Sequence, residues 1–348
     1  MRGLVLEGVE DVRYAADLPD PDVLAPTDAV VRVTAAGVCG SDLHPYLGRE
    51  PVAWGTVPGH ELVGEVVAVG ADVTSVRTGD RVLAPFTTSC GDCGPCRRGL
   101  SARCEHGRLL GYGPPGATAD GILHGAQAEL VRVPLADGTL VAVPDGLDDA
   151  TAVLLCDNLP TGWYAAERAG VGPGTTVAVV GLGAVGLCAV SAAFALGAAR
   201  VHGFDPVADR RERARRLGAE VADPDDAGGH RGLVVDATIE AAGPAPAQRF
   251  AAALVAPGGT LSIIAVQTAE AFGVPPVLAY DRNLTIRTGR APVRSLLARL
   301  LPRIGSGELA VPTDVVVTHP DVPLEDGPAA YTRFAAREAG LVKVVLRP

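Results

Sequence analysis

An uncharged stretch, residues 169–199, constrains the fold of this chain more than any other feature. Within it an apolar segment, residues 177–180, leads directly into Gly181, Gly183 and Gly186. A parallel strand that feeds a helix through a glycine-rich turn has this pattern, because helices cover both faces of such a sheet. A membrane span is the alternative, but proline and glycine open the stretch and further glycines interrupt it. The pattern predicts a Rossmann unit whose glycines approach the pyrophosphate of a dinucleotide at a helix N-terminus.

Asp205 indicates which dinucleotide binds. It ends the next apolar segment, residues 201–204, and follows Gly186 by 19 residues. A carboxylate at this position accepts hydrogen bonds from both adenosine ribose hydroxyls and repels a 2′-phosphate, which favours NAD over NADP. Arg210 and Arg211 would favour NADP if they bound its 2′-phosphate. The alternative is that both lie on a solvated helix face and bind no phosphate. The sequence therefore predicts an NAD site with Arg210 at its edge.

The distribution of apolar segments divides the chain into two domains. Residues 1–158 contain short β-rich segments punctuated by Gly, Pro and Asp, which predicts an all-β or β-barrel-like domain. Residues 159–291 alternate strand and helix patterns, which predicts a doubly wound parallel sheet, and residues 292–348 are expected to return to the first domain. With 48% hydrophobic residues, the 348-residue chain can fill both cores. The predicted fold class is therefore α/β.

Individual elements follow from the same periodicities. Strands are expected at residues 29–34, 62–69, 129–133, 176–180, 201–204, 233–238, 261–266, 315–318 and 341–346, and helices at residues 187–196, 209–217 and 293–304. The segment between Val221 and Leu233 is short and rich in Gly, Asp and Pro, so it has no room for a full crossover helix. This abbreviated crossover is expected to change the rim of the adenine pocket.

Charge and the N-terminal sequence exclude several classes of protein. The net charge is −10 and the basic residues are scattered, so neither nucleic acid nor an anionic membrane is an expected partner. The first ten residues have no sustained apolar run and resemble no signal peptide, which makes the cytoplasm the expected compartment. Seven cysteines in a cytoplasmic chain indicate metal binding or catalysis rather than disulfides.

Cys90, Cys93, Cys96 and Cys104 follow the spacing C-x2-C-x2-C-x7-C, with glycine and proline between them. A loop of this kind can wrap four thiolates around one tetrahedral zinc ion. Redox-labile free thiols are the alternative, but the spacing is specific for a metal. We expect a structural zinc that orders a surface lobe and takes no part in catalysis.

A second group of metal ligands is expected nearer the N-terminus. Cys39 and His60 belong to the segments CGSDLH, residues 39–44, and GHE, residues 59–61. A thiolate and an imidazole with one further protein ligand leave the fourth position of zinc for a substrate oxygen. The two groups of ligands predict two zinc ions per chain, one structural and one catalytic.

Several segments together carry a resemblance to a known family. They are CGSDLH, GHELVGEVVAVG at residues 59–70, the four-cysteine lobe, GLGAVG at residues 181–186 and the terminal LVKVVL. Over essentially the whole chain the sequence resembles the zinc-dependent medium-chain alcohol dehydrogenases. This resemblance implies a chaperonin-10-like (GroES-like) β-barrel catalytic domain joined to a Rossmann NAD-binding domain.

The same resemblance implies the third ligand of the catalytic zinc. In the family this ligand is commonly a cysteine four residues before a Thr-Gly pair, and here Asp157 precedes Thr161 by that spacing. The segment CDNLPTGW is similar to the subgroup that includes formaldehyde dehydrogenases, in which an aspartate takes this place. Cys156, one residue earlier, is the alternative. One carboxylate and one thiolate neutralise Zn²⁺ as two thiolates would, and the harder oxygen donor is expected to keep the ion a slightly stronger Lewis acid.

The resemblance also implies roles for neighbouring polar residues. The Ser41 hydroxyl touches the substrate oxygen, and the proton passes through the nicotinamide ribose to His44. The alternative is that His44 is an exposed loop histidine. Its fixed spacing from Cys39 argues against that alternative. Asp42 accepts the second ring N–H of His60 and so fixes the imidazole. Glu61 lies beside the metal, either as a transient ligand or as a structural carboxylate.

The remaining site residues are also implied by resemblance. Lys343 reaches the pyrophosphate, and residues 266–268, which begin with Val266, lie beside the nicotinamide. The positions around the substrate are Trp54, Phe86, Leu110 and Asn158, for which core packing is the alternative. Such walls favour a small or apolar alcohol. A symmetric homodimer or homotetramer is expected on resemblance alone.

The sequence therefore predicts an NAD-dependent zinc alcohol dehydrogenase. An alcohol held by zinc loses its proton, gives a hydride to NAD⁺ and leaves as an aldehyde or ketone. A redox-neutral aldehyde dismutase with tightly bound NAD would use the same residues. A non-catalytic protein that binds zinc and NAD is a third interpretation, which the retention of an open metal site with a proton relay disfavours.

Overall fold

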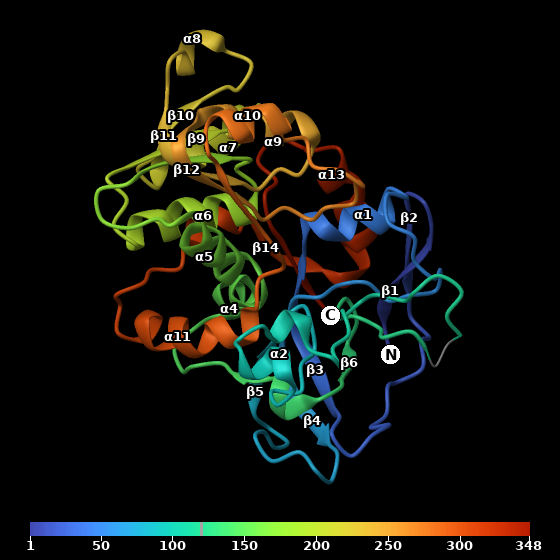
Figure 1. Ribbon diagram of the computed structural model, residues 1–348. Helices are drawn as coiled ribbons and strands as arrows, with labels where there is room; N and C mark the ends of the chain where they lie inside the picture. Colours follow the sequence, from blue (N-terminus) through green and yellow to red (C-terminus); the bar gives the residue numbers. More distant parts are fainter. Residues whose placement is uncertain (119–120) are drawn as a thin grey trace. The chain divides into compact units, whose positions relative to one another are not determined.

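The computed structural model describes residues 1–118 and 121–348, which divide into two compact units (Figure 1). The first unit comprises Met1–Asp157, Pro292–Ser306 and Val317–Pro348. The second unit comprises Asn158–Ala291 and Gly307–Val316. Among the described residues, no helix is long and apolar enough to cross a membrane.

Mostly antiparallel strands build the first unit. Its strands are β1 Gly3–Gly8, β2 Asp11–Ala15, β3 Ala29–Val38, β4 Leu62–Val69, β5 Arg81–Ala84, β6 Leu130–Val133, β7 Val141–Ala142, β14 His319–Pro323 and β15 Val344–Arg347. Its helices are α1 Leu43–Tyr46, α2 Gly94–Arg97, α3 Ala136–Thr139, α4 Asp149–Cys156, α11 Val293–Gly305 and α13 Gly327–Ala335. The sheet order is β14-β15-β3-β4-β5-β7, with β6 also paired to β3, while β1 and β2 form a separate pair. The long strand β3 is therefore the centre of the unit.

Two apolar cores fill the first unit. One contains Val31 of β3 and Leu62 of β4, both fully buried. The other joins distant parts of the sequence, because Leu4 of β1 belongs to the same cluster as Tyr331 of α13 and Leu346 of β15. Figure 1 shows the blue N-terminal strands beside the red α13. The C-terminal segment thus completes a domain that the N-terminal segment begins.

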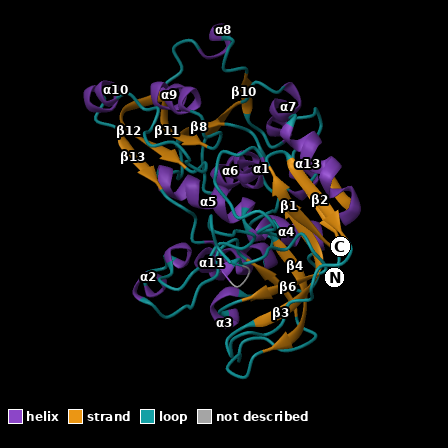
Figure 2. Cartoon of the chain, turned by 90° about the vertical axis from the view of Figure 1, so that its right-hand side faces the viewer, coloured by secondary structure: helices purple, strands orange, loops and turns teal. Residues whose placement is uncertain are grey.

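A parallel sheet with helices on both faces forms the second unit. Its strands are β8 Thr176–Val180, β9 Arg200–Phe204, β10 Glu220–Ala222, β11 Val235–Glu240, β12 Val255–Ile263 and β13 Thr285–Thr288. Its helices are α5 Asn158–Ala169, α6 Ala184–Ala195, α7 Ala208–Arg216, α8 Ala227–His230, α9 Ala245–Leu254, α10 Pro276–Asp281 and α12 Thr313–Val316. The strand order is β10-β9-β8-β11-β12-β13 with parallel pairing. Helix α9 covers one face and α5 and α6 the other (Figure 2), which confirms the predicted α/β fold.

The uncharged stretch contains β8, the glycine turn and α6. Helix α6 packs closely on α5. Helices α5 and α6 approach closely at Gly162, where an added Cβ would lie 2.6 Å from the Ala189 nitrogen and 2.7 Å from the Cys188 carbonyl carbon. Cys188 is fully buried, as its position in the predicted helix suggests. A larger residue at this crossing would force the two helices apart.

The structure corrects one predicted element and agrees with another. Residues 315–318 have a strand-like pattern, but the structure has the helix α12 followed by the strand β14. The strand prediction is wrong because short apolar runs do not distinguish the two states, and α12 buries Val315 and Val316 as well as a strand would. The crossover before β11 holds only the short α8, as its composition predicts. Its effect on the adenine pocket stays a prediction.

The units of the structure divide the C-terminal part of the chain differently from the predicted domains. We expect the functional domains to be 1–158, 159–291 and 292–348, and these boundaries stay predictions. In the structure, Gly307–Val316 groups with the second unit rather than with the first. This segment contains α12, which packs on α6 and α7.

We predict that Gly162→Ala destabilises the second unit by about 1 to 3 kcal/mol, because the new methyl group overpacks the contact between α5 and α6. Thermal unfolding followed by circular dichroism or calorimetry measures the change. Gly172→Ala is the matched control, since no atom lies within 4 Å of a Cβ added there. Equal midpoints for the two variants would contradict the packing argument.

Candidate metal centres and active site

Four buried side chains of the first unit bring their ligand atoms together. One ligand atom each from Cys39, His60, Glu61 and Asp157 lies within 4.8 Å of the others. All four residues are buried. Cys39, His60 and Asp157 are the three ligands that the family resemblance implies, and Glu61 lies among them.

The ends of regular elements position this cluster. Cys39 directly follows β3, and His60 lies two residues before β4. Strands β3 and β4 pair antiparallel with Ala36 opposite Leu62, so the end of one strand and the start of the other meet at one edge of the sheet. Asp157 is the C-cap residue of α4. The backbone hydrogen bonds of the sheet and helix therefore fix where the three side chains start.

Asp42 and Ser41 hold the two ring nitrogens of His60. Asp42 Oδ1 lies 2.9 Å from His60 Nδ1, and Asp42 Oδ2 accepts the backbone N–H of Cys39 at 2.9 Å. Ser41 Oγ lies 3.2 Å from His60 Nε2. Asp157 Oδ2 lies 3.4 Å from Cys39 Sγ and 3.9 Å from His60 Nε2. Sulfur, nitrogen and oxygen donors thus converge with the imidazole already oriented, which is the donor set of an open zinc site.

The electrostatics of the cluster also fit a cation. Burial, together with the carboxylates of Asp157 and Glu61, raises the pKa of the Cys39 thiol. Burial disfavours a charged His60 ring, but Asp42 and Cys39 together outweigh burial and raise the pKa of His60 well above its usual value. The polypeptide alone therefore favours protonated ligands, and zinc binding would release protons from them.

Glu61 forms a buried ion pair with Lys343. The Lys343 ammonium donates to Glu61 Oε2, and the two side chains are 1% and 0% exposed. Gly37 leaves the room for this pair, because an added Cβ there would lie 1.6 Å from Glu61 Oε2. Burial raises the pKa of Glu61 although Lys343 opposes it, and Glu61 raises the pKa of Lys343 against the effect of burial. The pyrophosphate contact implied for Lys343 stays a prediction.

Cys156 differs from Asp157 in where its side chain lies. Its thiol is fully buried and donates to the Leu62 carbonyl at 3.2 Å, and burial raises its pKa. Cys156 is not part of the cluster that unites Asp157 with Cys39. The geometry favours Asp157 as the third ligand.

His44 lies on α1, close to the cluster in sequence. Its side chain is half-buried, and its Nδ1 atom is buried without a hydrogen-bond partner among the described residues. Burial and the nearby Arg49 lower the pKa of His44, although Asp42 opposes them. A neutral imidazole at neutral pH can accept a proton.

The second cluster consists of Cys90, Cys93, Cys96 and Cys104, whose sulfur atoms lie within 4.8 Å of one another. The Cys93 backbone N–H donates to Cys90 Sγ at 3.3 Å, and the Glu105 N–H donates to Cys93 Sγ at 3.5 Å. Hydrogen bonds from the backbone of Glu105 and Cys96 lower the pKa of Cys93 to about 6, whereas burial raises the pKa of Cys96 to about 12. The loop thus directs its amide groups at sulfur, as a thiolate metal site requires.

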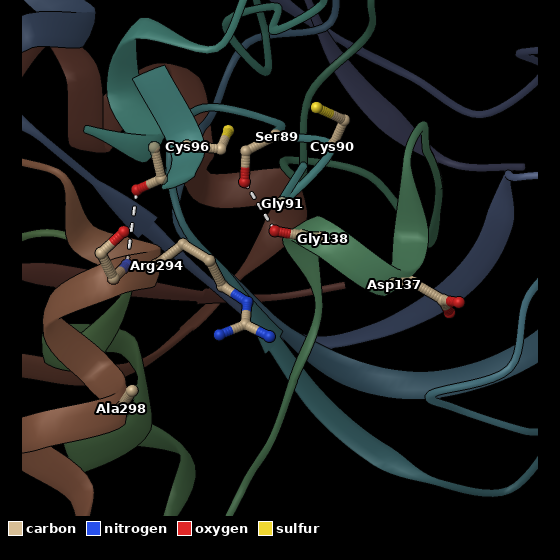
Figure 3. A pocket seen from close by; sticks show the side chains of 10 residues that line it. Ser89, Cys90, Gly91, Cys96, Asp137, Gly138, Arg294 and Ala298 are labelled. Carbon is tan, nitrogen blue, oxygen red and sulfur yellow. Dashed lines mark hydrogen bonds between the residues drawn. The ribbon is translucent and has the colours of Figure 1, made fainter. Parts of the chain in front are cut away.

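A pocket adjoins this second cluster. Its lining residues come from the cysteine loop, α3 and α11, and they are Ser89, Cys90, Gly91, Cys96, Ser101, Asp137, Gly138, Arg294, Ser295 and Ala298. Arg294 of α11 extends its guanidinium group into the pocket, and Ser89 Oγ donates to the Gly138 carbonyl at 2.6 Å (Figure 3). The pocket contains no residue of the first cluster, so it belongs to the structural lobe.

The glycine turn of the second unit is tightly packed at two of its three glycines. Gly181 has φ of +91°, and a Cβ there would lie 2.7 Å from the Ala242 nitrogen. A Cβ at Gly186 would lie 1.8 Å from the Gly181 carbonyl oxygen. Gly183, the N-cap of α6, faces open space. Open space at this position is what the close approach of a pyrophosphate requires.

Asp205 lies directly after β9 and is 4% exposed. Its two oxygens accept the backbone N–H groups of Leu182 and Val207 at 2.9 and 2.8 Å. Arg210 Nη1 lies 3.7 Å from Asp205 Oδ2, so the predicted edge residue is beside the predicted ribose ligand. Val266, the residue implied beside the nicotinamide, is exposed.

The predicted substrate positions have different surroundings. The Phe86 ring lies edge-on to the His60 ring, with 6.3 Å between the ring centroids. Leu110 is part of the first unit's apolar core, which is the core-packing alternative for this residue. Trp54 is exposed, and Asn158, the first residue of α5, is fully buried. Phe86 therefore has the firmest geometric link to the cluster.

Comparisons with known proteins identify the family. The alcohol dehydrogenase GroES-like domain matches residues 25–145, and the zinc-binding dehydrogenase domain matches residues 184–301. A Mycobacterium tuberculosis protein described as a probable zinc-binding alcohol dehydrogenase is 38% identical, over 100% of this chain and 89% of that protein. The chain belongs to the zinc-dependent medium-chain alcohol dehydrogenases.

Two further relatives support this membership. The solved structure of an alcohol dehydrogenase from Thermus sp. ATN1 shares 38% identity with a TM-score of 0.89, covering 100% of this chain and 99% of that one. A glutathione-independent formaldehyde dehydrogenase of Pseudomonas aeruginosa is 31% identical over 96% of this chain and 95% of that protein. The predicted family, fold and zinc-dependent alcohol oxidoreductase function are thereby confirmed.

Three residues beside the first cluster belong to no sequence motif. Gln127 Nε2 lies 3.4 Å from Asp42 Oδ2, and Tyr331 donates to Gln127. Gly37 lies against Glu61. A glycine inside an apolar strand signals a close approach of another group, so Gly37 could have been flagged from the sequence. Gln127 and Tyr331 carry no comparable signal.

We predict that Lys343→Met destabilises this alcohol dehydrogenase in a pH-dependent way, because it leaves the Glu61 carboxylate buried without a cation. The folded-state pKa of Glu61, already raised by burial, rises further without the ammonium. The folded protein then holds a proton that the unfolded chain releases, so stability falls as pH rises. The free energy of unfolding of the variant should be only slightly below that of the wild type near about pH 5. Near about pH 8 it should be lower by about 3 to 5 kcal/mol.

Calorimetric unfolding across this pH range measures the deficit. The double variant Lys343→Met, Glu61→Gln is the control, since it removes both charges and should recover most of the lost stability. A deficit that does not change with pH would contradict the assignment of a buried, paired carboxylate.

Proposed function

We propose that the chain is an NAD-dependent alcohol dehydrogenase whose catalytic zinc ligands are Cys39, His60 and Asp157. The observation that supports this most strongly is the convergence of these three ligand atoms in a buried cluster. Their donor set, one sulfur, one nitrogen and one oxygen, is suited to zinc. When bound, zinc would supply the Lewis acidity that lowers the pKa of an alcohol hydroxyl.

The polypeptide supplies orientation and proton transfer. Asp42 holds His60 Nδ1 and so directs Nε2 toward the metal position. Ser41 Oγ, 3.2 Å from that nitrogen, is in position to accept a hydrogen bond from an alcohol hydroxyl and to take up its proton while passing its own proton onward to His44. His44 has a lowered pKa, so it is neutral at neutral pH and can take up the proton and release it to water. Glu61 stays paired with Lys343 as a nearby carboxylate.

NAD is the proposed hydride acceptor. Gly181, Gly183 and Gly186 form a turn with open space at Gly183 for a pyrophosphate. The Asp205 carboxylate supports the choice of NAD over NADP, because a 2′-phosphate beside it would be repelled. Arg210 lies close enough to Asp205 to offset part of that charge, so the preference depends on both residues. We propose Lys343 and Val266 as further cofactor contacts on family resemblance alone.

The proposed substrate is a small or apolar alcohol or its aldehyde. The aromatic ring of Phe86 beside His60 supports an apolar wall next to the metal. Trp54, Leu110 and Asn158 are proposed on resemblance. Hydrated formaldehyde belongs among the substrates to be tested, because one relative is named a formaldehyde dehydrogenase.

The test of this proposal is turnover of an alcohol panel with NAD⁺ or NADP⁺, measured by NADH or NADPH absorbance. We expect turnover with NAD⁺, and a loss of about 10²-fold or more in Asp157→Ala, because a metal ligand is removed. The control is Asp148→Ala on the same helix, which removes an N-cap hydrogen bond to the Thr151 N–H at 2.7 Å. It should cost about 1 kcal/mol of stability and leave turnover unchanged. Wild-type turnover with NADP⁺ alone, or full turnover by Asp157→Ala, would contradict the proposal.

We also propose a structural zinc held by Cys90, Cys93, Cys96 and Cys104, which brings the content to two zinc ions per chain. Elemental analysis should find about two zinc ions in the wild type and about one in Cys104→Ser. Cys188→Ala is the control, because Cys188 is buried in α6 outside both clusters and its loss should leave the zinc content unchanged. One zinc ion in the wild type would leave a cluster without its proposed metal.

Finally, we propose that the protein forms a homodimer or homotetramer and works in the cytoplasm. The exposed strand β13 at the edge of the second unit's sheet supports association, since an open edge offers unpaired backbone groups. Val277 and Tyr280 of the preceding α10 are 71% and 84% exposed. An apolar surface of this kind next to an open edge suits a second copy of the chain.

A further inference from the structure

A chain of hydrogen bonds leads from the C-terminal helix α13 to the catalytic cluster. The Tyr331 hydroxyl donates to Gln127 Oε1 at 2.8 Å. Gln127 Nε2 donates to the Gly37 carbonyl at 3.2 Å and to Asp42 Oδ2 at 3.4 Å. We call Tyr331 and Gln127 the relay pair, because Tyr331 bonds to Gln127 and Gln127 bonds to Asp42.

Asp42 passes the effect of the relay pair to two metal ligands at once. Its Oδ1 atom holds His60 Nδ1 at 2.9 Å, while Oδ2 accepts the Cys39 backbone N–H at 2.9 Å. The amide of Gln127 is a further donor to Oδ2. Any change in how Gln127 is held therefore changes the hydrogen bonds available to the carboxylate that orients His60.

Burial makes this arrangement specific. Tyr331 and Gln127 are both 0% exposed, so a lost hydrogen bond leaves a buried polar group, at a cost in free energy. The Gly37 carbonyl can only accept and the Tyr331 hydroxyl donates to the other amide atom, which fixes the amide orientation. Gly59 leaves room for the side chain, because an added Cβ would lie 2.5 Å from Gln127 Cγ. Burial and the Asp42 charge raise the pKa of Tyr331 well above its usual value, so the hydroxyl keeps its proton.

We propose that Tyr331 and Gln127 are positioning residues for the catalytic zinc, which they stabilise by fixing the Asp42 carboxylate that orients His60. This inference rests on the proposed zinc site and adds residues from outside its motifs. It links occupancy of the metal site to α13, which lies in the C-terminal part of the chain. The competing explanation is that Tyr331 only fills the apolar core that it shares with Leu4 and Leu346.

Tyr46 provides a matched control for the competing explanation. Its ring is 5.3 Å from that of Tyr331, belongs to the same core cluster and is 4% exposed. In the described part of the chain, its hydroxyl takes no part in the hydrogen bonds that lead to Asp42. Tyr46→Phe and Tyr331→Phe therefore remove the same atom from neighbouring buried rings, and only one of them breaks the relay.

The experiment measures zinc release from the wild type and both variants to a chromogenic chelator. We expect two phases in the wild type, one for each cluster. Tyr331→Phe should speed the phase of the catalytic zinc by about threefold or more, less than the about 10- to 100-fold effect of losing a group bonded directly to a ligand, and leave the cysteine-cluster phase unchanged. Tyr46→Phe should leave both phases unchanged. Equal effects of the two variants, or an effect of Tyr331→Phe on both phases, would overturn the proposal.

Cobalt substitution gives an independent readout. In Tyr331→Phe and in Gln127→Met the visible bands of Co²⁺ in the catalytic site should shift, because His60 is held differently, while the bands of the cysteine site stay constant. Identical spectra in all three proteins would overturn the proposal even if zinc release changed. Failure of the proposed function shows separately, as absence of wild-type alcohol turnover, because both readouts here report metal binding rather than activity.

Discussion

The burial of several acidic side chains in one place is the constraint on which the first unit depends. Cys39, Asp42, Glu61 and Asp157 are all buried, and the Lys343 ammonium lies among them. Burying like charges is costly unless each has a partner. Lys343 accordingly pairs with Glu61, and Asp42 accepts the backbone N–H of Cys39 and lies 2.9 Å from His60 Nδ1. A divalent cation would bring the cluster close to neutrality, which is why the family's zinc chemistry suits this position in the fold.

Small residues are as necessary to this arrangement as the ligands. Gly37 leaves space for the Glu61 carboxylate, and Gly59, with φ of +96°, leaves space for Gln127. The polar groups around the cluster thereby pack directly against one another. In the second unit, Gly162 and Gly186 have the corresponding function, since they allow helices and turns to approach each other more closely than any side chain would permit.

Features whose distances are set by local sequence could be predicted, and features set by tertiary packing could not. Ser41 and Asp42 lie beside Cys39 because the chain itself holds them there, and the glycine turn follows β8 for the same reason. Tyr331 meets Gln127 across 204 residues, and no local pattern encodes that contact. The short helix α12 could not be predicted either, because four residues with two adjacent valines suit a strand as well as a helix. The burial of Lys343 also depends on tertiary packing, namely on β15 being paired with β3.

The return of the C-terminal segment has a consequence for biosynthesis. Strand β3, close to the N-terminus, pairs with β15 at residues 344–346, while the second unit is almost entirely encoded before residue 292. A ribosome releases the chain from its N-terminus onward, so the parallel sheet can fold early. At that time the β-rich unit still lacks strands β14 and β15 and part of its core. During that interval β3 and the apolar side of β1 are exposed to chaperones and to other nascent chains. The buried Glu61 carboxylate also has to wait for Lys343, its cationic partner, until the last residues are synthesised.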